Sequence, residues 1–114
     1  MSIVHNNPGM TVVATAVIDR NRLVTRLGAH CGADAVNDVL GVSEASAAIG
    51  GTVPLRFKSA GTLRCVASVA ITIDALVYKA AAGKVGLTGA NAIVGRALSA
   101  ASGDNVEIIV QPIG

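Results

Sequence analysis

Turn-forming residues interrupt this chain at intervals of roughly ten residues, and that spacing limits the length of any regular element. The segments between the turns are rich in Val and Ile, which are stiff at the first side-chain torsion and favour strands. The chain has 114 residues, enough for one domain, and its 13 glycines supply the turns. These features predict an all-β fold, a sandwich or small barrel of short antiparallel strands.

The alternation of side chains locates the strands along the chain. Residues 52–58 place Val53, Leu55 and Phe57 on one face, which is the period of a strand. Pro54 cannot donate a ladder hydrogen bond, so this strand is expected at an edge or unpaired at that position. Neighbouring segments are expected to form hairpins, and no internal repeat is evident. The expected hairpins join 11–18 to 23–27, 52–58 to 62–69, and 75–79 to 84–87, and further strands are expected at 39–42, 92–100 and 106–110.

Two Ala-rich stretches leave a second fold open. Residues 43–50 begin with Ser43, a possible helix cap, and end at Gly50 and Gly51. If this stretch and 90–101 were helices, the fold would be α+β, whereas the all-β fold allows at most one short helix. At the N-terminus, Asn, Pro and Gly favour a turn or tail. We therefore expect an extended, flexible arm over residues 1–10 and a single β domain over 11–114.

Reactive side chains are few and scattered. His30, Cys31, Asp34 and Asp38 are close in sequence but do not have the spacing of metal ligands. Neighbouring residues on an extended chain point to opposite faces, which argues against a His30–Cys31 nucleophile pair. The aspartates lie beside Gly, Asn or Ala, where they usually shape turns. We expect no catalytic residues, no metal and no cofactor, and hence no enzyme.

Lys79 and the glycine-rich segment after it require a separate test. Residues 83–89 (GKVGLTG) lack the order of glycines, Lys and Ser/Thr that holds a phosphate. A lysine at a hairpin tip also resembles the attachment site of biotin or lipoate carrier domains, but here Tyr78 and Ala80 flank it. We expect Lys79 to be solvated near a strand end, with a carrier or ligand-binding barrel as a rival interpretation.

The remaining composition favours assembly over binding to nucleic acid or membrane. A hydrophobic share of 52% with only 14% charged residues suits a protein that hides surface against partners. The net charge of +2 is small, and the basic residues are scattered apart from Arg20, Arg22 and Arg26. Residues 1–8 lack the apolar core of a signal peptide, and no apolar run reaches the length of a membrane span. Cys31 and Cys65 are expected to be reduced thiols in a cytosolic setting.

The second half of the chain carries a family resemblance. Residues 73–85 (IDALVYKAAAGKV) and 87–110 (LTGANAIVGRALSAASGDNVEIIV) resemble consecutive segments of tailed-phage head decoration, or capsid cement, proteins. There a strand with an aromatic residue enters a small-residue turn, and a Ser-Gly-Asp turn precedes the last Val/Ile strand. Residues 38–47 and 52–57 are similar to earlier segments of that family.

The resemblance implies a fold and a function. Members of the family are small β-barrels or β-tulip-like domains that bind the outer surface of an expanded phage head, often as trimers. They bridge neighbouring major capsid subunits and stabilise the shell against internal DNA pressure, without a cofactor or a reaction. The expected location is therefore the outside of the virion capsid, after synthesis in the host cytoplasm.

The partner contacts are expected from the N-terminal arm and the strand after it. This set consists of Ile3, Val4, His5, Asn6, Asn7, Val12 and Val13. Leu55 and Phe57 are expected in the core or at an interface. Another virion component, in the tail, the baseplate or the base of a head fibre, is the structural alternative.

Overall fold

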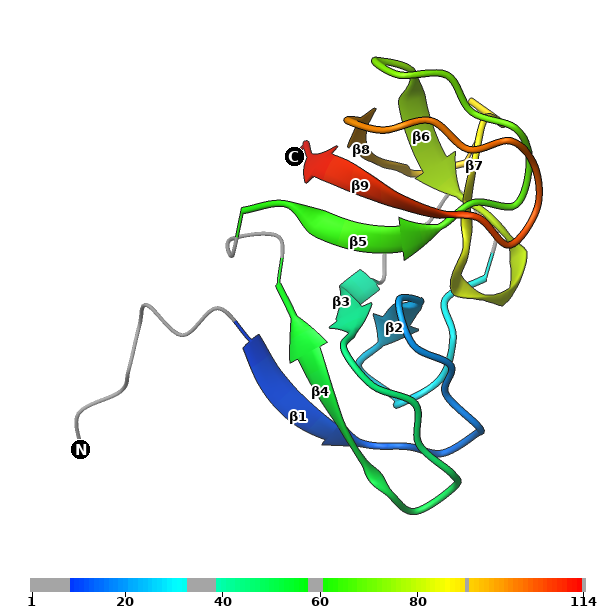
Figure 1. Ribbon diagram of the computed structural model, residues 1–114. Helices are drawn as coiled ribbons and strands as arrows, with labels where there is room; N and C mark the ends of the chain where they lie inside the picture. Colours follow the sequence, from blue (N-terminus) through cyan, green and yellow to red (C-terminus); the bar gives the residue numbers. More distant parts are fainter. Residues whose placement is uncertain (1–8, 33–38, 58–60, 90, 114) are drawn as a thin grey trace.

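The computed structural model describes residues 9–32, 39–57, 61–89 and 91–113 (Figure 1). Its strands are β1 (Gly9–Val13), β2 (Leu23–Thr25), β3 (Val39–Ser43), β4 (Thr52–Arg56), β5 (Leu63–Val66), β6 (Leu76–Lys79), β7 (Val85–Gly86), β8 (Ile93–Ala97) and β9 (Glu107–Pro112). The one helical element in these ranges is the 3₁₀ turn η2 (Ala81–Gly83). The prediction of an all-β fold with at most one short helix is confirmed.

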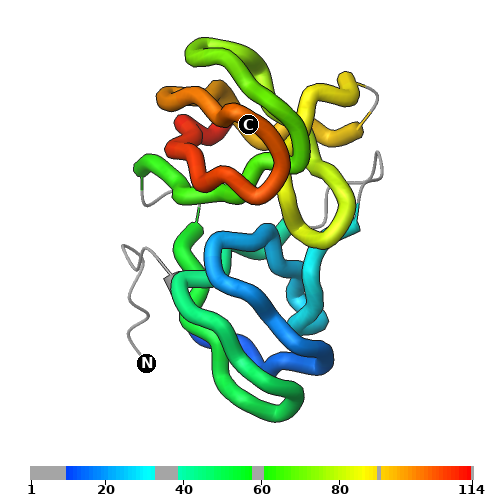
Figure 2. The backbone as a smooth tube through the Cα atoms, turned by 45° about the vertical axis from the view of Figure 1, so that its right-hand side comes forward, coloured from blue at the N-terminus to red at the C-terminus, as the bar shows by residue number. Residues whose placement is uncertain are grey.

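The strands form two antiparallel sheets, one from each half of the chain. The first sheet has the order β1-β4-β3-β2, and the second has the order β5-β9-β8-β6-β7. Figure 2 shows the halves stacked along the long axis, with blue to green below and green to red above. The molecule extends 44 × 29 × 23 Å.

The two halves repeat one scaffold, which the sequence did not reveal. We call residues 9–57 repeat A and residues 61–113 repeat B. When β1, β2, β3 and β4 are matched to β5, β6, β8 and β9, the strand orders are identical, and β7 is an addition to repeat B. An isolated antiparallel bridge follows the same strands in each half, Ile18 with Ala47 and Ile71 with Ala101. The expectation of no internal repeat was wrong for the backbone.

The repeats also agree in their irregularities. The pairing of β2 with β3 shifts register after Val24, and the pairing of β6 with β8 shifts after Val77. Asn21 and Asp74 have positive φ values of 62° and 73° at equivalent turns. Such conformations cost energy for residues other than glycine, and their recurrence at one position indicates that the scaffold requires them.

A glycine stands at the same place in the third strand of each repeat. A Cβ atom on Gly41 would lie 2.9 Å from the Arg56 carbonyl oxygen, and one on Gly95 would lie 2.1 Å from that of Gln111. The neighbouring backbone approaches too closely for any side chain at these two positions.

The strand order explains which hairpins were predicted wrongly. The last strand of each repeat lies between its first and third strands, so β4 pairs with β1 and β3, and β5 pairs with β9. The expected hairpins of 11–18 with 23–27 and of 52–58 with 62–69 are therefore absent. The hairpin of 75–79 with 84–87 is confirmed by the pairing of β6 with β7.

Pro54 lies in a central strand, not at a sheet edge as one alternative required. The amide of Glu44 donates to the Pro54 carbonyl at 2.9 Å, but Pro54 has no N–H to return the bond. The ladder between β3 and β4 ends there, after the pair of Ser43 with Leu55. The pairing of β4 with β3 is therefore interrupted at Pro54, while Thr11 of β1 still pairs with it on the other side.

Three boundaries differ from expectation. β1 begins at Gly9, so Gly9 and Met10 belong to a strand and not to an arm, and it ends at Val13 instead of reaching residue 18. Ser43 ends β3, residues 44–50 form a loop tied by the bridge of Ala47 to Ile18, and 93–97 is strand β8. Both helix alternatives were wrong because backbone pairing with distant segments outweighed local propensity.

Two apolar clusters hold the sheets. The smaller belongs to repeat A alone, with Ile18, Val24, Val53 and Leu55 fully buried. The larger fills repeat B and also takes in Leu23, Cys31 and Val42 of repeat A. Since these three side chains pack against repeat B, the joint between the repeats is part of the buried core.

Candidate functional site

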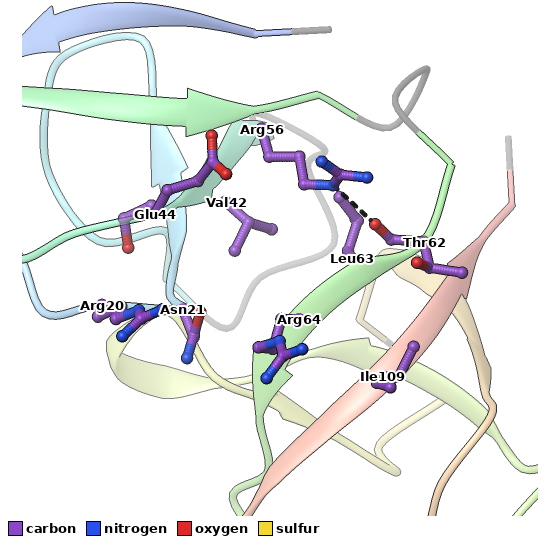
Figure 3. Close-up of a pocket in the computed structure, with 10 residues that line it drawn as sticks. Arg20, Asn21, Val42, Glu44, Arg56, Thr62, Leu63, Arg64 and Ile109 are labelled. Atoms are coloured by element: carbon purple, nitrogen blue, oxygen red, sulfur yellow. Dashed lines mark hydrogen bonds between the residues drawn. The ribbon is translucent and has the colours of Figure 1, made fainter.

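A cleft of about 320 Å³ opens beside that joint (Figure 3). Repeat A contributes the turn before β2 and the ends of β3 and β4, while repeat B contributes β5 and β9. The lining residues are Arg20, Asn21, Val42, Ser43, Glu44, Arg56, Thr62, Leu63, Arg64 and Ile109.

Polar contacts across the cleft connect the repeats. The Arg56 Nε donates to the Thr62 carbonyl at 2.9 Å. The Glu107 carboxylate, next to the cleft, accepts from Asn21 Nδ2 at 2.8 Å and from Arg64 Nη1 at 2.9 Å. Both oxygens of Glu107 are thus used, and Glu44 is the one carboxylate in the lining itself.

A second candidate surface lies on repeat A, where the segment after β1 meets the turns at 25–28 and 48–51. Its side chains are each more than half exposed, and Leu27 reaches 71%. Hydrogen bonds join the segments that carry them, from Thr15 N to Gly28 O and from Ala14 N to Gly51 O. We call this surface the apolar tip, defined by Val13, Val17, Leu27 and Ile49.

Repeat B lacks such a tip at the equivalent positions. Val13 and Val17 correspond to the half-buried Val66 and to Ala70. The turn that carries Ile49 corresponds to residues 102–104, which have no apolar side chain. The scaffold therefore does not require exposed apolar side chains here, and such a patch is typical of a protein contact surface.

Of the predicted partner residues, the structure describes only two. Ile3, Val4, His5, Asn6 and Asn7 lie outside the described residues. Val12 is half-buried against the core of repeat A, while Val13 is exposed in the apolar tip. Leu55 is fully buried and Phe57 half-buried, which places Leu55 in the core.

Lys79 was predicted wrongly. Its side chain is 1% exposed, the largest of the fully buried side chains in the described ranges. It lies inside repeat B on β6 instead of in solvent near a strand end. A carrier lysine must be reached by a modifying enzyme, so the buried position removes the basis for the carrier interpretation.

Among the described residues, His30, Cys31 and Cys65 show no catalytic arrangement. The Asp19 amide donates to His30 Nε2 at 3.0 Å, which uses the lone pair that a general base needs. Burial lowers the pKa of His30, Arg22 lowers it further, and Asp19 opposes both. Cys31 and Cys65 are free thiols, and burial raises the pKa of Cys65 to about 12. A thiol with that pKa is a poor nucleophile at neutral pH.

Among the acidic residues, Asp104 makes a contact within repeat B. Asp104 accepts from Lys84 Nζ at 2.8 Å, and that bond is the main cause of its lowered pKa. No group of three or more potential metal ligands occurs among the described residues. A helix long and apolar enough to span a membrane is also not found within them.

The arginines clustered in sequence around the start of β2 differ in their surroundings. Arg22 is mostly buried and donates through Nη1 to the Ala82 carbonyl at 2.9 Å, so it joins the repeats. Arg20 is exposed and lines the cleft with Arg56 and Arg64. Sequence analysis missed this grouping because the three arginines come from separate elements. Of the residues in the apolar tip, sequence analysis identified only Val13 as a candidate for partner binding.

Comparison with solved structures finds a related fold. The chain is similar to the crystal structure of the head fibre gp8.5 N base in bacteriophage phi29, with a TM-score of 0.70 and 16% sequence identity. The match covers 90% of this chain and 92% of that one. At this identity the likeness shows the fold alone. A search of curated proteins finds no match.

Comparison with protein-family models finds one that spans nearly the whole chain. The phage cement protein family matches residues 4–112, which includes both repeats and the cleft between them. This match confirms the resemblance to capsid cement proteins seen in the sequence. The chain therefore belongs to the phage cement protein family, as a structural component of the outside of a phage capsid.

Proposed function

We propose that this protein binds major capsid subunits on the expanded phage head and bridges neighbours, so that the shell resists internal DNA pressure. The match to the phage cement family over residues 4–112 is the observation that carries the proposal. In this role the protein needs binding surfaces and no catalytic group. His30 Nε2 accepts a hydrogen bond, Cys65 is buried with a raised pKa, and Asp104 is paired with Lys84. These states agree with a non-catalytic protein.

Binding stabilises the shell through a difference in affinity. A protein that binds the expanded lattice better than other states stabilises that lattice by its differential binding free energy. Contacts to two subunits at once make the second contact intramolecular, which adds avidity to individually weak contacts. The molecule offers surfaces at separate places on its 44 Å length, the apolar tip and the cleft.

The apolar tip is the surface we assign to the capsid. The scaffold does not require the exposed side chains of the apolar tip, because repeat B has no such side chains at the equivalent positions. The preceding segment, residues 1–8, enters β1 directly, and β1 is an edge strand of its sheet. We therefore propose that this segment and β1 also contact the capsid, and that copies associate as trimers, as the family resemblance implies.

The test compares expanded capsids with and without the protein. We expect heating or chelation to release DNA at a higher threshold when the protein is bound, and equal thresholds would remove the cementing function. A variant with Val17→Ser and Leu27→Ser should lose most capsid binding in co-sedimentation while its unfolding curve stays unchanged. Ile73→Ser is the matched control, because Ile73 is equally exposed but belongs to repeat B.

Deletion of residues 1–8 tests the N-terminal segment separately. It leaves β1 complete, so the domain should fold while its affinity for capsids falls. Wild-type affinity of the deleted chain would show that the segment makes no contact. The similarity to a head fibre base makes a fibre attachment role the second candidate. A reconstruction of the particle distinguishes the two functions. For a cement protein no further density extends outward from the bound domain, whereas for a fibre base the density of the fibre continues outward from it.

A further inference from the structure

Within the chain, one copy of the repeated scaffold already binds the other. Val42 of repeat A and Leu63 of β5 belong to one apolar cluster, and Arg56 Nε of repeat A donates to the Thr62 carbonyl at 2.9 Å. The two contacting surfaces are different, since repeat A contributes the ends of β3 and β4 and repeat B contributes the start of β5. Each scaffold has both kinds of surface, so a contact of this type uses one surface of each repeat and leaves the other unused.

The surface that repeat A contributes to the joint recurs on repeat B, where it is exposed. Val42 and Glu44 of repeat A correspond to Arg96 and Leu98 of repeat B, as the registers of the two sheets show. Leu98 is 44% exposed, and its amide donates at 2.8 Å to the carbonyl of Ile109, whose side chain is also exposed. The scaffold does not require an apolar residue here, because repeat A has the charged Glu44. An apolar centre with polar side chains around it is typical of a protein contact surface.

The surface that repeat B contributes to the joint recurs on repeat A. β1 corresponds to β5, and Met10 has the place of Leu63 in the ladder. Met10 is 45% exposed, whereas Leu63 is buried in the joint. Side chains alternate along a strand, so Met10 and Val13 point to opposite faces of β1. A partner that covers Met10 therefore leaves the apolar tip free.

We infer that copies of this chain associate head to tail, with the Leu98 surface of repeat B in one copy packed on β1 of the next. The contact repeats between copies the joint that already holds the two repeats together. β1 (GMTVV) has no charged residue, so it matches the apolar centre of Leu98 and Ile109, while Arg96 stays at the rim beside Asp74. Contacts between different surfaces form a ring when the rotation closes. The number of copies rests on the proposed function, in which they associate as trimers, and a ring of three leaves neither surface uncovered.

The first experiment tests both surfaces without a capsid. Sedimentation velocity compares the full chain with its Met10→Asp and Leu98→Asp variants. We expect trimers of the wild type at concentrations where each variant is monomeric, because each variant is blocked at one surface and its association is weakened about tenfold or more. An equal mixture of the two variants should form a dimer, since each supplies the surface that the other lacks. Val69→Asp is the matched control, because Val69 is as exposed as Leu98 but belongs to neither surface, and it should form trimers.

Three results would overturn the inference: a wild-type chain that stays monomeric, a mixture that forms no dimer, or a Met10→Asp variant that still associates alone. Unfolding curves show whether the variants are folded, and Met10→Ser or Leu98→Ser replaces an aspartate variant that is not. Co-sedimentation of the wild type with expanded capsids separates this inference from the proposed function. Trimers that bind no capsid would remove the proposed function alone, and a monomeric chain that binds capsids would remove the inference alone.

Discussion

Met10 in repeat A and Leu63 in repeat B occupy the same place in the first strand of each repeat. Met10 pairs with Leu55 and Leu63 pairs with Val110, at equivalent points of the two ladders. Yet Met10 is 45% exposed and Leu63 is 2% exposed. The difference arises because β5 lies in the joint between the repeats, where Val42 belongs to the same cluster as Leu63. Nothing in the described part of the chain covers β1 in that way.

This contrast shows how one scaffold serves two purposes. Repeat B is closed by repeat A along β5 and by the added strand β7 at its other edge. Repeat A keeps an exposed first strand and an apolar tip. The half with uncovered surface is the one that we assign to the capsid, and the half with the larger buried cluster supports it.

The largest effect is expected at the paired glycines. Gly95→Ala places a Cβ atom 2.1 Å from a backbone oxygen, while Gly41→Ala places one at 2.9 Å. We expect Gly95→Ala to lower the free energy of unfolding by about 3 kcal/mol or more and Gly41→Ala by less, because backbone atoms cannot move aside easily. Chemical denaturation measures both, with Gly103→Ala as the control since its Cβ meets nothing within 4 Å. Equal losses of stability at both glycines would show that the neighbouring strands can move apart to make room for the added Cβ atom.

The next largest effect is expected from truncating the equivalent residues of β1 and β5. Leu63→Ala should cost about 2–5 kcal/mol, because it opens a cavity in the shared cluster. Met10→Ala should cost less than about 1 kcal/mol, because Met10 is already partly in water. Both unfolding curves should show one transition, since the larger cluster joins the repeats. A separate transition for repeat A in the Leu63→Ala variant would contradict that joint.

A smaller effect distinguishes the turns with positive φ. Asn21→Gly relieves backbone strain but removes the bond to Glu107 that links the repeats, so we expect a net loss of about 1 kcal/mol. Asp74→Gly relieves similar strain at an exposed side chain and should be neutral or slightly stabilising. Thermal unfolding checks the sign of each. Equal changes would show that the contact with Glu107 contributes nothing.

The smallest effect concerns His30, which has no counterpart in repeat B. Its pKa in the folded state is lowered, so the unfolded chain binds the proton first as the pH falls. The stabilising contribution is complete above the ordinary pKa of about 6.5 and is lost as the pH falls through the lowered value. Melting temperatures between about pH 7 and pH 5 should decline for wild type and less for His30→Gln. An identical decline in both proteins would show that groups other than His30 cause the pH dependence.

The sequence predicted best what short-range chemistry decides. The hairpin of β6 with β7 forms across a small-residue turn, so it follows from residues that are neighbours in sequence. The failures in strand pairing share one cause, because β4 and β9 each pair with the first strand of their repeat, which is far from them in sequence. Alternation along 52–58 identified a strand and its buried face, but alternation contains no information about partners.

The candidate site was less accessible to sequence analysis for the same reason. Arg20, Arg56 and Arg64 become neighbours only after both repeats fold and pack. Lys79 was expected in solvent because it stands near the end of an expected strand, while its burial depends on the packing of repeat B. The match between the repeats was hidden because the two halves share backbone geometry and few side chains.

The place of β9 within its sheet has a consequence during synthesis on the ribosome. β5 leaves the ribosome early in the second half but pairs only with β9, which is made last and lies between β5 and β8. Repeat A can close once Arg56 has emerged, whereas repeat B waits for nearly the whole chain. Folding of the second half is therefore slow, as expected where strand pairing spans long sequence distances. A product cut short before Glu107 therefore lacks the strand that pairs with β5 and joins it to β8.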